Sequence, residues 1–506
     1  MSDDKFTELA QFELDPDSVR MLPKPFCLRH DVVVLGEFDR EEDQSVTVGM
    51  LDPSDGDLKL QIADLIQHPI DGVQLNQYEI DKAIREGFGS GGYSQRDAIV
   101  IPDRSDQENP KTAKTMVEQI ISRAVKQGAS DIHIETFKDD VDLRFRIDGI
   151  LHQMYTNLSP RNVDEVVNRI KILAELDITE QRRPQDGRIQ CEMTLPERGE
   201  TDIDFRISIV PAPAGEDVVI RILDSEAGLM PVTDLGMKPE MEETFLQMLQ
   251  NPEGLILVTG PTGSGKTTTL YASLLEINDG RRKIITAEDP IEYDIDKICQ
   301  KEVSEQMPLP LLLRALLRQD PDVMLVGEIR DEITGETALA ASNTGHVVFG
   351  TVHTPDAIGT LTRLRGLGLD NSEMADALLG VVSQRLVRCV CSECGESVEA
   401  TDEQRSLFGP KVDDLDLRKG TGCSECHHTG YDGREGIFEL LVIDREIQEM
   451  ISDGVSATDL REYVRDRGHR DLLDDAYQKV DDGETTLDEL SRVVPFRQIL
   501  SRRQND

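Results

Sequence analysis

A glycine-rich stretch between residues 255 and 274, LILVTGPTGSGKTTTLYASL, constrains the fold of this chain more than any other feature. The apolar run Leu255–Val258 predicts a buried strand, and Thr268–Leu275 predicts a helix. Between them, Gly260–Thr267 fits the phosphate-binding pattern G-x-x-x-x-G-K-[ST]. Glycines let backbone N–H groups wrap around a polyphosphate, and the helix N-terminus adds positive dipole charge. The residues predicted to bind the nucleotide are Gly260, Pro261, Thr262, Gly263, Ser264, Gly265, Lys266, Thr267 and Thr268.

Two side chains of this loop have separate expected roles. Lys266 should reach the β- and γ-phosphates, and the Thr267 hydroxyl should hold Mg²⁺. A glycine-rich turn that matches by chance is the alternative, but the strand before it and the helix after it disfavour that interpretation. The sequence therefore predicts a site for ATP with Mg²⁺.

Composition narrows the class of protein. A length of 506 residues indicates about three or four domains. The net charge is 55 − 98 = −43, which opposes nonspecific binding to nucleic acid or to an anionic membrane surface. No apolar run approaches the ~18 residues of a membrane-spanning helix, and the acidic N-terminus does not have the order of a signal peptide. We expect a cytoplasmic protein that binds no nucleic acid directly.

The first part of the chain predicts two α+β domains. Residues 1–86 form a small unit without a catalytic constellation, which we expect to bind partners, and residues 87–111 are a glycine-rich and polar linker. Residues 112–230 form the second domain, in which four strands with period two are predicted. Arginines recur on those strands, and they either lie on a solvated face or present guanidinium groups to phosphate oxygens. They are Arg144, Arg146, Arg206 and Arg221.

Residues 233–388 alternate predicted strands with helices, which indicates a mostly parallel sheet covered on both faces. Ligands of such sheets bind at the carboxyl ends of the strands. Gly260, Glu288, Glu328 and His353 each follow or end a predicted strand, so we expect them to converge at one edge of the sheet.

These residues suit ATP hydrolysis. Glu328, after the strand Val323–Val326, suits a carboxylate linked to Mg²⁺, although a glutamate at the start of a helix is the plainer interpretation. Glu288, Asp289 and Glu292 surround one proline, and at least one could polarise the attacking water, unless they only cap a turn. His346 and His353 flank a predicted strand of the same sheet. Three arginines expected near the same edge could serve the site in trans, as arginine fingers do; they are Arg314, Arg318 and Arg330.

Cysteines cluster late in the chain, in residues 389–436. Two C-x-x-C pairs are separated by 28 residues, and in a cytosolic chain such pairs suggest a structural Zn²⁺ rather than disulfides. Buried free thiols are the alternative, and Cys389, His427 and His428 are possible substitute ligands. Residues 437–506, which include Glu439–Val442, are expected to be helical. The predicted zinc ligands are Cys391, Cys394, Cys423 and Cys426.

The motifs together resemble the type II secretion and type IV pilus assembly ATPases, a family of hexameric motors, from about Ala113 to Val494. Four nucleotide motifs occur in the family's order: GPTGSGKTTTL (260–270), TAEDPIEY (286–293), LRQDPDVMLVGEIRD (317–331) and TGHVVFGTVHT (344–354). GASDIHIE (128–135), RFRIDGIL (144–151) and RRPQDGR (182–188) are similar to its second domain. The cysteines and GYDGREGIFELL (430–441) are similar to its zinc-bearing part.

The resemblance implies a RecA-like P-loop domain preceded by a small PAS-like domain. It implies that Glu292 orients the water with support from Glu288, that Glu328 lies on the Mg²⁺ side, and that His353 senses the γ-phosphate, with His346 nearby. It also implies that four arginines close over the nucleotide, namely Arg206, Arg221, Arg314 and Arg318.

By the same resemblance, we expect an ATPase motor that drives protein export or pilus assembly through an inner-membrane platform, as a homo-oligomer that reaches the membrane only through partners. A nucleotide-gated scaffold with little turnover and a nucleic-acid translocase are the alternatives. The repeated Arg-Leu-Gly/Leu pattern with which some relatives bind cyclic di-GMP is not found in the sequence, so that ligand is not expected.

Overall fold

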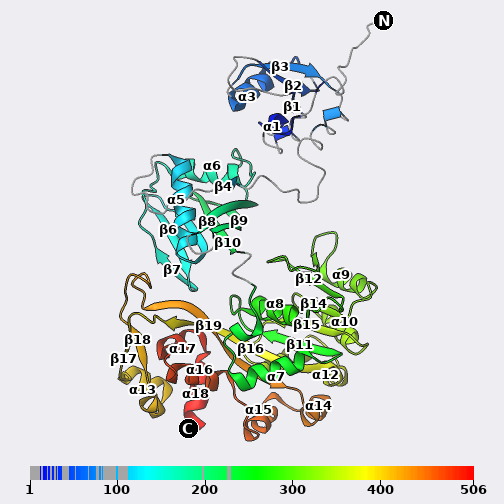
Figure 1. The fold of residues 1–506 in the computed structure, drawn as a ribbon, viewed down its shortest axis with the longest axis vertical. Coiled ribbons are helices and arrows are strands. Elements are labelled where there is room, and N and C mark those ends of the chain that lie inside the picture. Colours follow the sequence, from blue (N-terminus) through cyan, green and yellow to red (C-terminus); the bar gives the residue numbers. More distant parts are fainter. Residues whose placement is uncertain are drawn as a thin grey trace. The chain divides into compact units, whose positions relative to one another are not determined.

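The computed structural model describes residues 112–195, 199–224 and 229–505, together with shorter stretches between residues 12 and 100. The chain divides into two compact units, Met1–Leu223 and Asp224–Asp506, which are described separately (Figure 1). The predicted linker 87–111 lies outside the described residues except for a two-residue strand, β4 (Ile99–Val100). The boundaries proposed for the smaller domains remain predictions.

The first unit begins with a three-stranded sheet in the order β1-β2-β3. β1 (Val32–Leu35) is antiparallel to β2 (Val46–Met50), and β2 is parallel to β3 (Ile70–Gln74). A parallel pair needs a crossover connection, and α3 (Gly56–Ile66) supplies it. The sequence predicts a helix over Leu58–Ile66, which α3 confirms; of a second helix predicted over Glu79–Ile84, only residues 79, 80 and 83 are described.

A seven-stranded sheet forms the rest of the first unit, in the order β4-β8-β9-β10-β5-β6-β7. Buried and less buried side chains alternate along β5, as period two predicts. β8 was not predicted, although Ile189, Cys191 and Met193 alternate in its sequence and are all buried. Helices α5 (Ala113–Lys126) and α6 (Val163–Leu173) pack on this core. The strands are β5 (Ala129–Thr136), β6 (Val141–Ile147), β7 (Ile150–Gln153), β8 (Gln185–Leu195), β9 (Gly199–Ala212) and β10 (Gly215–Asp224).

The second unit is built on another seven-stranded sheet, in the order β13-β12-β14-β15-β11-β16-β19. All neighbouring pairs are parallel except β16 with β19, so the mostly parallel sheet is confirmed. The strands are β11 (Gly254–Thr259), β12 (Ile284–Glu288), β13 (Cys299–Glu302), β14 (Val323–Val326), β15 (Val347–Val352), β16 (Leu378–Val390) and β19 (Tyr431–Val442).

Helices cover both faces of this sheet, because successive residues of each central strand point into different cores (Figure 1). Leu255 and Leu257 of β11 join one cluster, and Ile256 and Val258 join the other. The first cluster includes α9 (Leu309–Leu316), α10 (Glu332–Ser342), α11 (Ala357–Gly366), α12 (Asn371–Ala377), α14 (Arg445–Ser452) and α15 (Ala457–Asp466). The second includes α7 (Pro239–Leu249), α8 (Lys266–Ile277) and the short η2 (Val232–Asp234).

The expected helix at Glu439–Val442 is wrong. These residues end β19, which runs antiparallel to β16, with Glu439 opposite Ser383. A short apolar run does not distinguish a buried strand from a buried helix, and here the pairing with β16 decides. The rest of the C-terminal region is helical, with α13 (Asp402–Phe408), α16 (Leu472–Asp481), α17 (Leu487–Val493) and α18 (Phe496–Asn505) beside the short strands β17 (Gly395–Ser397) and β18 (Arg418–Gly420) and η3 (Pro410–Asp414).

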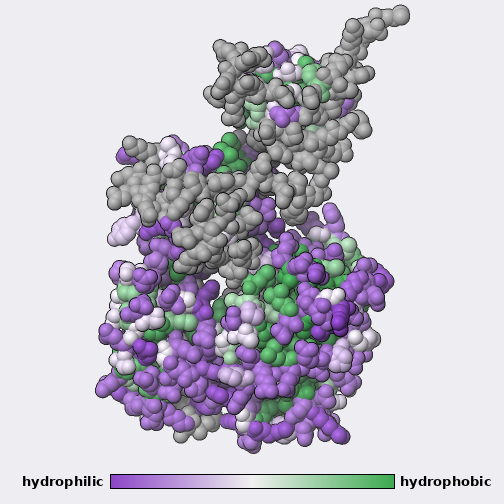
Figure 2. Space-filling model, viewed as in Figure 1, coloured by the Kyte–Doolittle hydropathy of each residue, from purple (hydrophilic) through white to green (hydrophobic). Residues whose placement is uncertain are grey.

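The surface of the second unit is mostly hydrophilic, in agreement with the 30% of charged residues in the sequence. Hydrophilic side chains cover most of the visible described surface of the second unit (Figure 2). Within the described part of the chain, no helix is both long enough and apolar enough to cross a bilayer.

Candidate functional site

The carboxyl ends of four parallel strands bring the predicted residues to one edge of the second unit's sheet. Gly260 follows β11, Glu288 ends β12, Glu328 follows β14 by one residue, and His353 follows β15. Because these strands are parallel neighbours in the order β12-β14-β15-β11, their ends lie side by side. An ion-pair contact joins two of the residues directly, with His353 Nε2 3.4 Å from Glu328 Oε1.

The phosphate loop has the backbone that its glycines permit. Gly260, Gly263 and Gly265 all have positive φ, at 155°, 75° and 86°. A Cβ at Gly260 would lie 2.5 Å from the Gln384 carbonyl oxygen, so a larger residue does not fit there. α8 begins at Lys266, which directs the helix N-terminus at the loop, and Pro261, Thr262, Gly263 and Thr267 are exposed to solvent.

Lys266 folds back onto the loop. Its Nζ donates to the carbonyl oxygens of Gly260 and Pro261, both at 3.0 Å. Burial lowers the pKa of Lys266 to about 8, while the negative charge of Glu328 opposes that change. The charges of Lys266 and Glu328 therefore interact at this end of the sheet.

Glu328 is held by cations. Arg330 Nη2 donates to Glu328 Oε2 at 2.6 Å. Burial alone would raise the pKa of Glu328, but the hydrogen bond from Arg330 and the charges of His353, Arg330 and Lys266 lower it below its usual range. Glu328 is thus ionised at neutral pH, which is the state that a Mg²⁺ ligand requires; its role at a metal remains a prediction.

Glu288 and Glu292 have different environments. Glu288 is 4% exposed, and its carboxylate accepts from Tyr271, from Thr286 Oγ1 at 2.5 Å and from Gln300 Nε2 at 3.2 Å. Glu292 is only partly buried. Glu288 is therefore buried and accepts from three side chains, whereas Glu292 keeps part of its surface exposed to solvent.

Sequence reasoning missed several polar residues that build this site. Gln384 on β16 is 2% exposed and accepts from Thr269 Oγ1 of α8 at 2.7 Å. Arg385 is buried beside it and donates to the Pro355 carbonyl oxygen at 2.8 Å, just beyond His353. No motif marks either residue, because β16 was not predicted. The contact of Gln384 also spans more than a hundred residues of sequence, and that of Arg385 about thirty.

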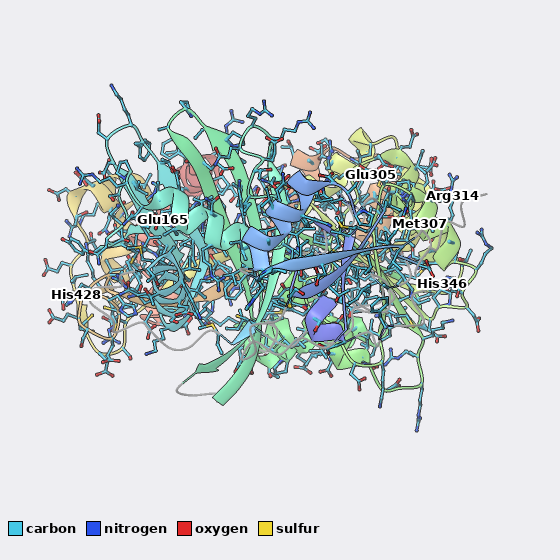
Figure 3. The ribbon with its side chains drawn as sticks, turned by 90° about the horizontal axis from the view of Figure 1, so that it is seen from above. Glu165, Glu305, Met307, Arg314, His346 and His428 are labelled. Carbon is cyan, nitrogen blue, oxygen red and sulfur yellow. The ribbon has the colours of Figure 1, made fainter. Side chains whose placement is uncertain are left out.

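Two residues lie away from the expected edge of the sheet. His346 precedes β15 and bonds to the Ala341 carbonyl oxygen at 2.8 Å, so it lies at the amino edge of the sheet and not near His353. Arg318 follows α9 and also lies at that edge, because the next residue, Gln319, accepts from Lys283 ahead of β12. Arg314 is exposed on α9, on the opposite side of the molecule from His428 in Figure 3, and its role at a nucleotide remains a prediction.

The arginines of the first unit are placed within its own sheet. Arg221 Nε lies 3.3 Å from Asp131, and Arg146 lies 3.4 Å from the same carboxylate. Arg144 pairs with Glu135. Arg206 lies on β9, on a face that alternates with buried Phe205 and Ile207. Any role of Arg206 and Arg221 at a nucleotide remains a prediction.

The four predicted cysteines come together in the second unit. The sulfur atoms of Cys391, Cys394, Cys423 and Cys426 all lie within 4.8 Å of one another. Three of the pairs are separated by 3.7–3.8 Å, and sulfurs placed tetrahedrally at about 2.3 Å from Zn²⁺ are about 3.8 Å apart. Cys389, His427 and His428 are not members of the cluster.

Backbone N–H groups complete the surroundings of these thiols. Gly422 donates to Cys394 Sγ at 3.3 Å, and Cys423 and Gly430 donate to Cys426 Sγ at 3.2 and 3.3 Å. Such donors favour the thiolate that a metal requires. The donor set therefore fits a closed structural Zn²⁺ site.

Comparison with known proteins supports the family that the sequence motifs indicate. The family described as "Type II/IV secretion system protein" matches residues 106–492, and the MshEN domain matches residues 5–93. The chain belongs to the type II/IV secretion system protein family. The resemblance noted in the sequence is thus confirmed, and it extends to the first domain.

Relatives cover nearly the whole chain. It is 38% identical to the type II secretion system ATPase E of Vibrio cholerae over 96% of this chain and 99% of that one. It is 35% identical to the type IV pilus assembly ATPase PilB of Myxococcus xanthus, over 95% and 87%. Among solved structures, the pilus retraction motor PilT with bound ADP matches at 28% identity and a TM-score of 0.52, over 76% of this chain and 98% of that one.

Proposed function

We propose that this chain is an ATPase motor that hydrolyses ATP to drive protein export or pilus assembly through an inner-membrane platform. The observation that carries the proposal is the convergence of the phosphate loop, Glu328 and His353 at the carboxyl ends of parallel neighbouring strands, where Arg330 and His353 both contact the Glu328 carboxylate. Family membership and the named ATPases among the relatives support it.

Each residue has a role in this proposal. Lys266 and the loop amides bind the phosphates, and Thr267 and Glu328 hold Mg²⁺, which neutralises phosphate charge when bound. Glu292 orients the attacking water, and His353 contacts the γ-phosphate from the next strand. Arg206 and Arg221 of the first unit, and Arg314 on α9 and Arg318 just after it, complete a site on closure or in a neighbouring subunit.

The exposed placement of Arg314 and Arg318 favours a role in a neighbouring subunit, since their own phosphate loop lies at the carboxyl edge of the sheet. This in turn favours a closed homo-oligomer, which we propose is a hexamer. We further propose that the protein is cytoplasmic and reaches the inner membrane only through partner proteins.

The proposal is tested by ATP turnover of the full-length chain with and without its membrane partner. We expect Lys266→Ala and Glu328→Gln each to lower kcat by about 100-fold or more, the order that loss of a positioned catalytic group costs. If the wild type and both variants are equally inactive with the partner present, the chain is a nucleotide-gated scaffold and not a motor.

A further inference from the structure

The hydroxyl of Tyr271 joins the helix of the phosphate loop to the acidic loop. Tyr271 lies on α8, five residues after Lys266, and is 1% exposed. Its hydroxyl donates to Glu288 Oε2, and its oxygen accepts from the backbone N–H of Glu292 at 3.4 Å. A single side chain thus contacts the buried carboxylate and the backbone of the accessible one.

Gln300 on β13 holds the other end of the same loop. Its Nε2 donates to Glu288 Oε1 at 3.2 Å and to the Tyr293 carbonyl oxygen at 2.9 Å. Its Oε1 accepts from the backbone N–H of Ile295 at 2.8 Å. The segment that carries Glu292 is therefore bound by one side chain from α8 and by another from the edge strand of the sheet.

We propose that Tyr271 and Gln300 are positioning residues that hold Glu292 where its carboxylate orients the attacking water. The inference rests on the proposed ATPase function. Glu288 is the anchor of the loop and not the residue that meets water, because it is buried and accepts from three side chains.

Two observations support this arrangement. Burial, with the adjacent charge of Glu288, raises the pKa of Tyr271 well above its usual range, so its hydroxyl stays a donor at any physiological pH. The ring of Tyr271 also contacts that of Tyr293 edge-on, with centroids 6.2 Å apart. The ring therefore packs against the loop while the hydroxyl fixes it, so the two contributions can be separated by substitution.

Tyr271→Phe in the full-length chain makes that separation, because it keeps the ring and removes the hydroxyl. We expect kcat for ATP to fall about tenfold, since hydrogen bonds to charged groups contribute at least that factor. We expect the KM for ATP to change less than about twofold, because the phosphate loop is untouched. Ser273→Ala is the matched control, since Ser273 is also buried on α8 but bonds only within the helix, to Thr269.

Gln300→Ala provides a second route to the same loop. We expect the same selective loss of kcat, and the double variant with Tyr271→Phe should lose less than the product of the single losses, because both act on one segment. Unchanged kcat in Tyr271→Phe would overturn the inference, as would a loss equalled by Ser273→Ala or multiplicative losses in the double variant. If the wild type itself has no turnover, the ATPase proposal fails as well. If the wild type is active, Lys266→Ala is inactive and Tyr271→Phe keeps the wild-type kcat, only the positioning role fails.

Discussion

Removing zinc from the cysteine cluster should unfold a defined part of the second unit. The cluster joins the end of β16 to the start of β19, because Cys391 follows the first strand and Cys426 precedes the second. Double substitution Cys423→Ser/Cys426→Ser removes two of the four ligands and avoids the side effects of a chelator. Cys389→Ser is the control, since Cys389 is near in sequence but outside the cluster.

Loss of the metal should remove most of the free energy that stabilises the cysteine segment, residues 391–397 and 418–430. Structural Zn²⁺ contributes about 10–16 kcal/mol in cysteine-rich peptides, whereas a whole domain is stable by about 5–15 kcal/mol. Without the metal, the segment keeps the two-stranded sheet of β17 and β18, which is marginally stable alone, and surface contacts such as the exposed ion pair of Lys419 with Asp488, 3.6 Å apart. Phe408 of α13 instead packs in the C-terminal core, with its ring 6.2 Å from that of Tyr477.

We therefore expect local unfolding of residues 391–397 and 418–430, with α13 and the parallel sheet retained. Hydrogen exchange measured peptide by peptide checks this, together with one zinc per chain in the wild type and in Cys389→Ser. Unchanged exchange protection of these residues in the double variant, or wild-type protein without zinc after purification in its presence, would refute the reasoning.

Three further outcomes follow from the second unit. Gly260→Ala should abolish ATP binding without unfolding the protein, because the added Cβ would meet the Gln384 carbonyl oxygen at 2.5 Å; equilibrium binding of ATP and a thermal melt check it. Lys479→Met should lower the free energy of unfolding by about 3 kcal/mol in denaturant titration, because Lys479 is 1% exposed and pairs with Glu435. Burial would raise the pKa of Glu489, but Arg388 and Arg492 lower it below its usual range. The stability that Glu489 gives the folded protein is therefore complete above the ordinary carboxylate pKa and is lost as pH falls through the folded pKa. The melting temperature of Glu489→Gln should accordingly depend less on pH below about pH 4.5 than that of the wild type.

Much of the fold could be predicted because its central elements are local. The apolar run Val323–Val326 is β14 to the residue, and the alternation of strands and helices gave the parallel sheet. Parallel order alone then places Glu288 and Glu328 at one edge. Strands β16 and β19 were harder to predict, because they pair with each other across the whole segment that holds the cysteines. In addition, Glu439–Val442 has no periodicity that excludes a helix.

The sequence by itself determined the phosphate loop, the carboxylates beside it and the four cysteines, because each chemistry requires certain residue types at short, fixed spacings. Only the tertiary structure decided that Glu288 is buried among donors while Glu292 is partly exposed, since Tyr271 and Gln300 reach Glu288 from other elements. It also brought Gln384 and Arg385 of β16 against Thr269 and Pro355. These contacts join segments far apart in the chain, so packing sets them and no local pattern records them.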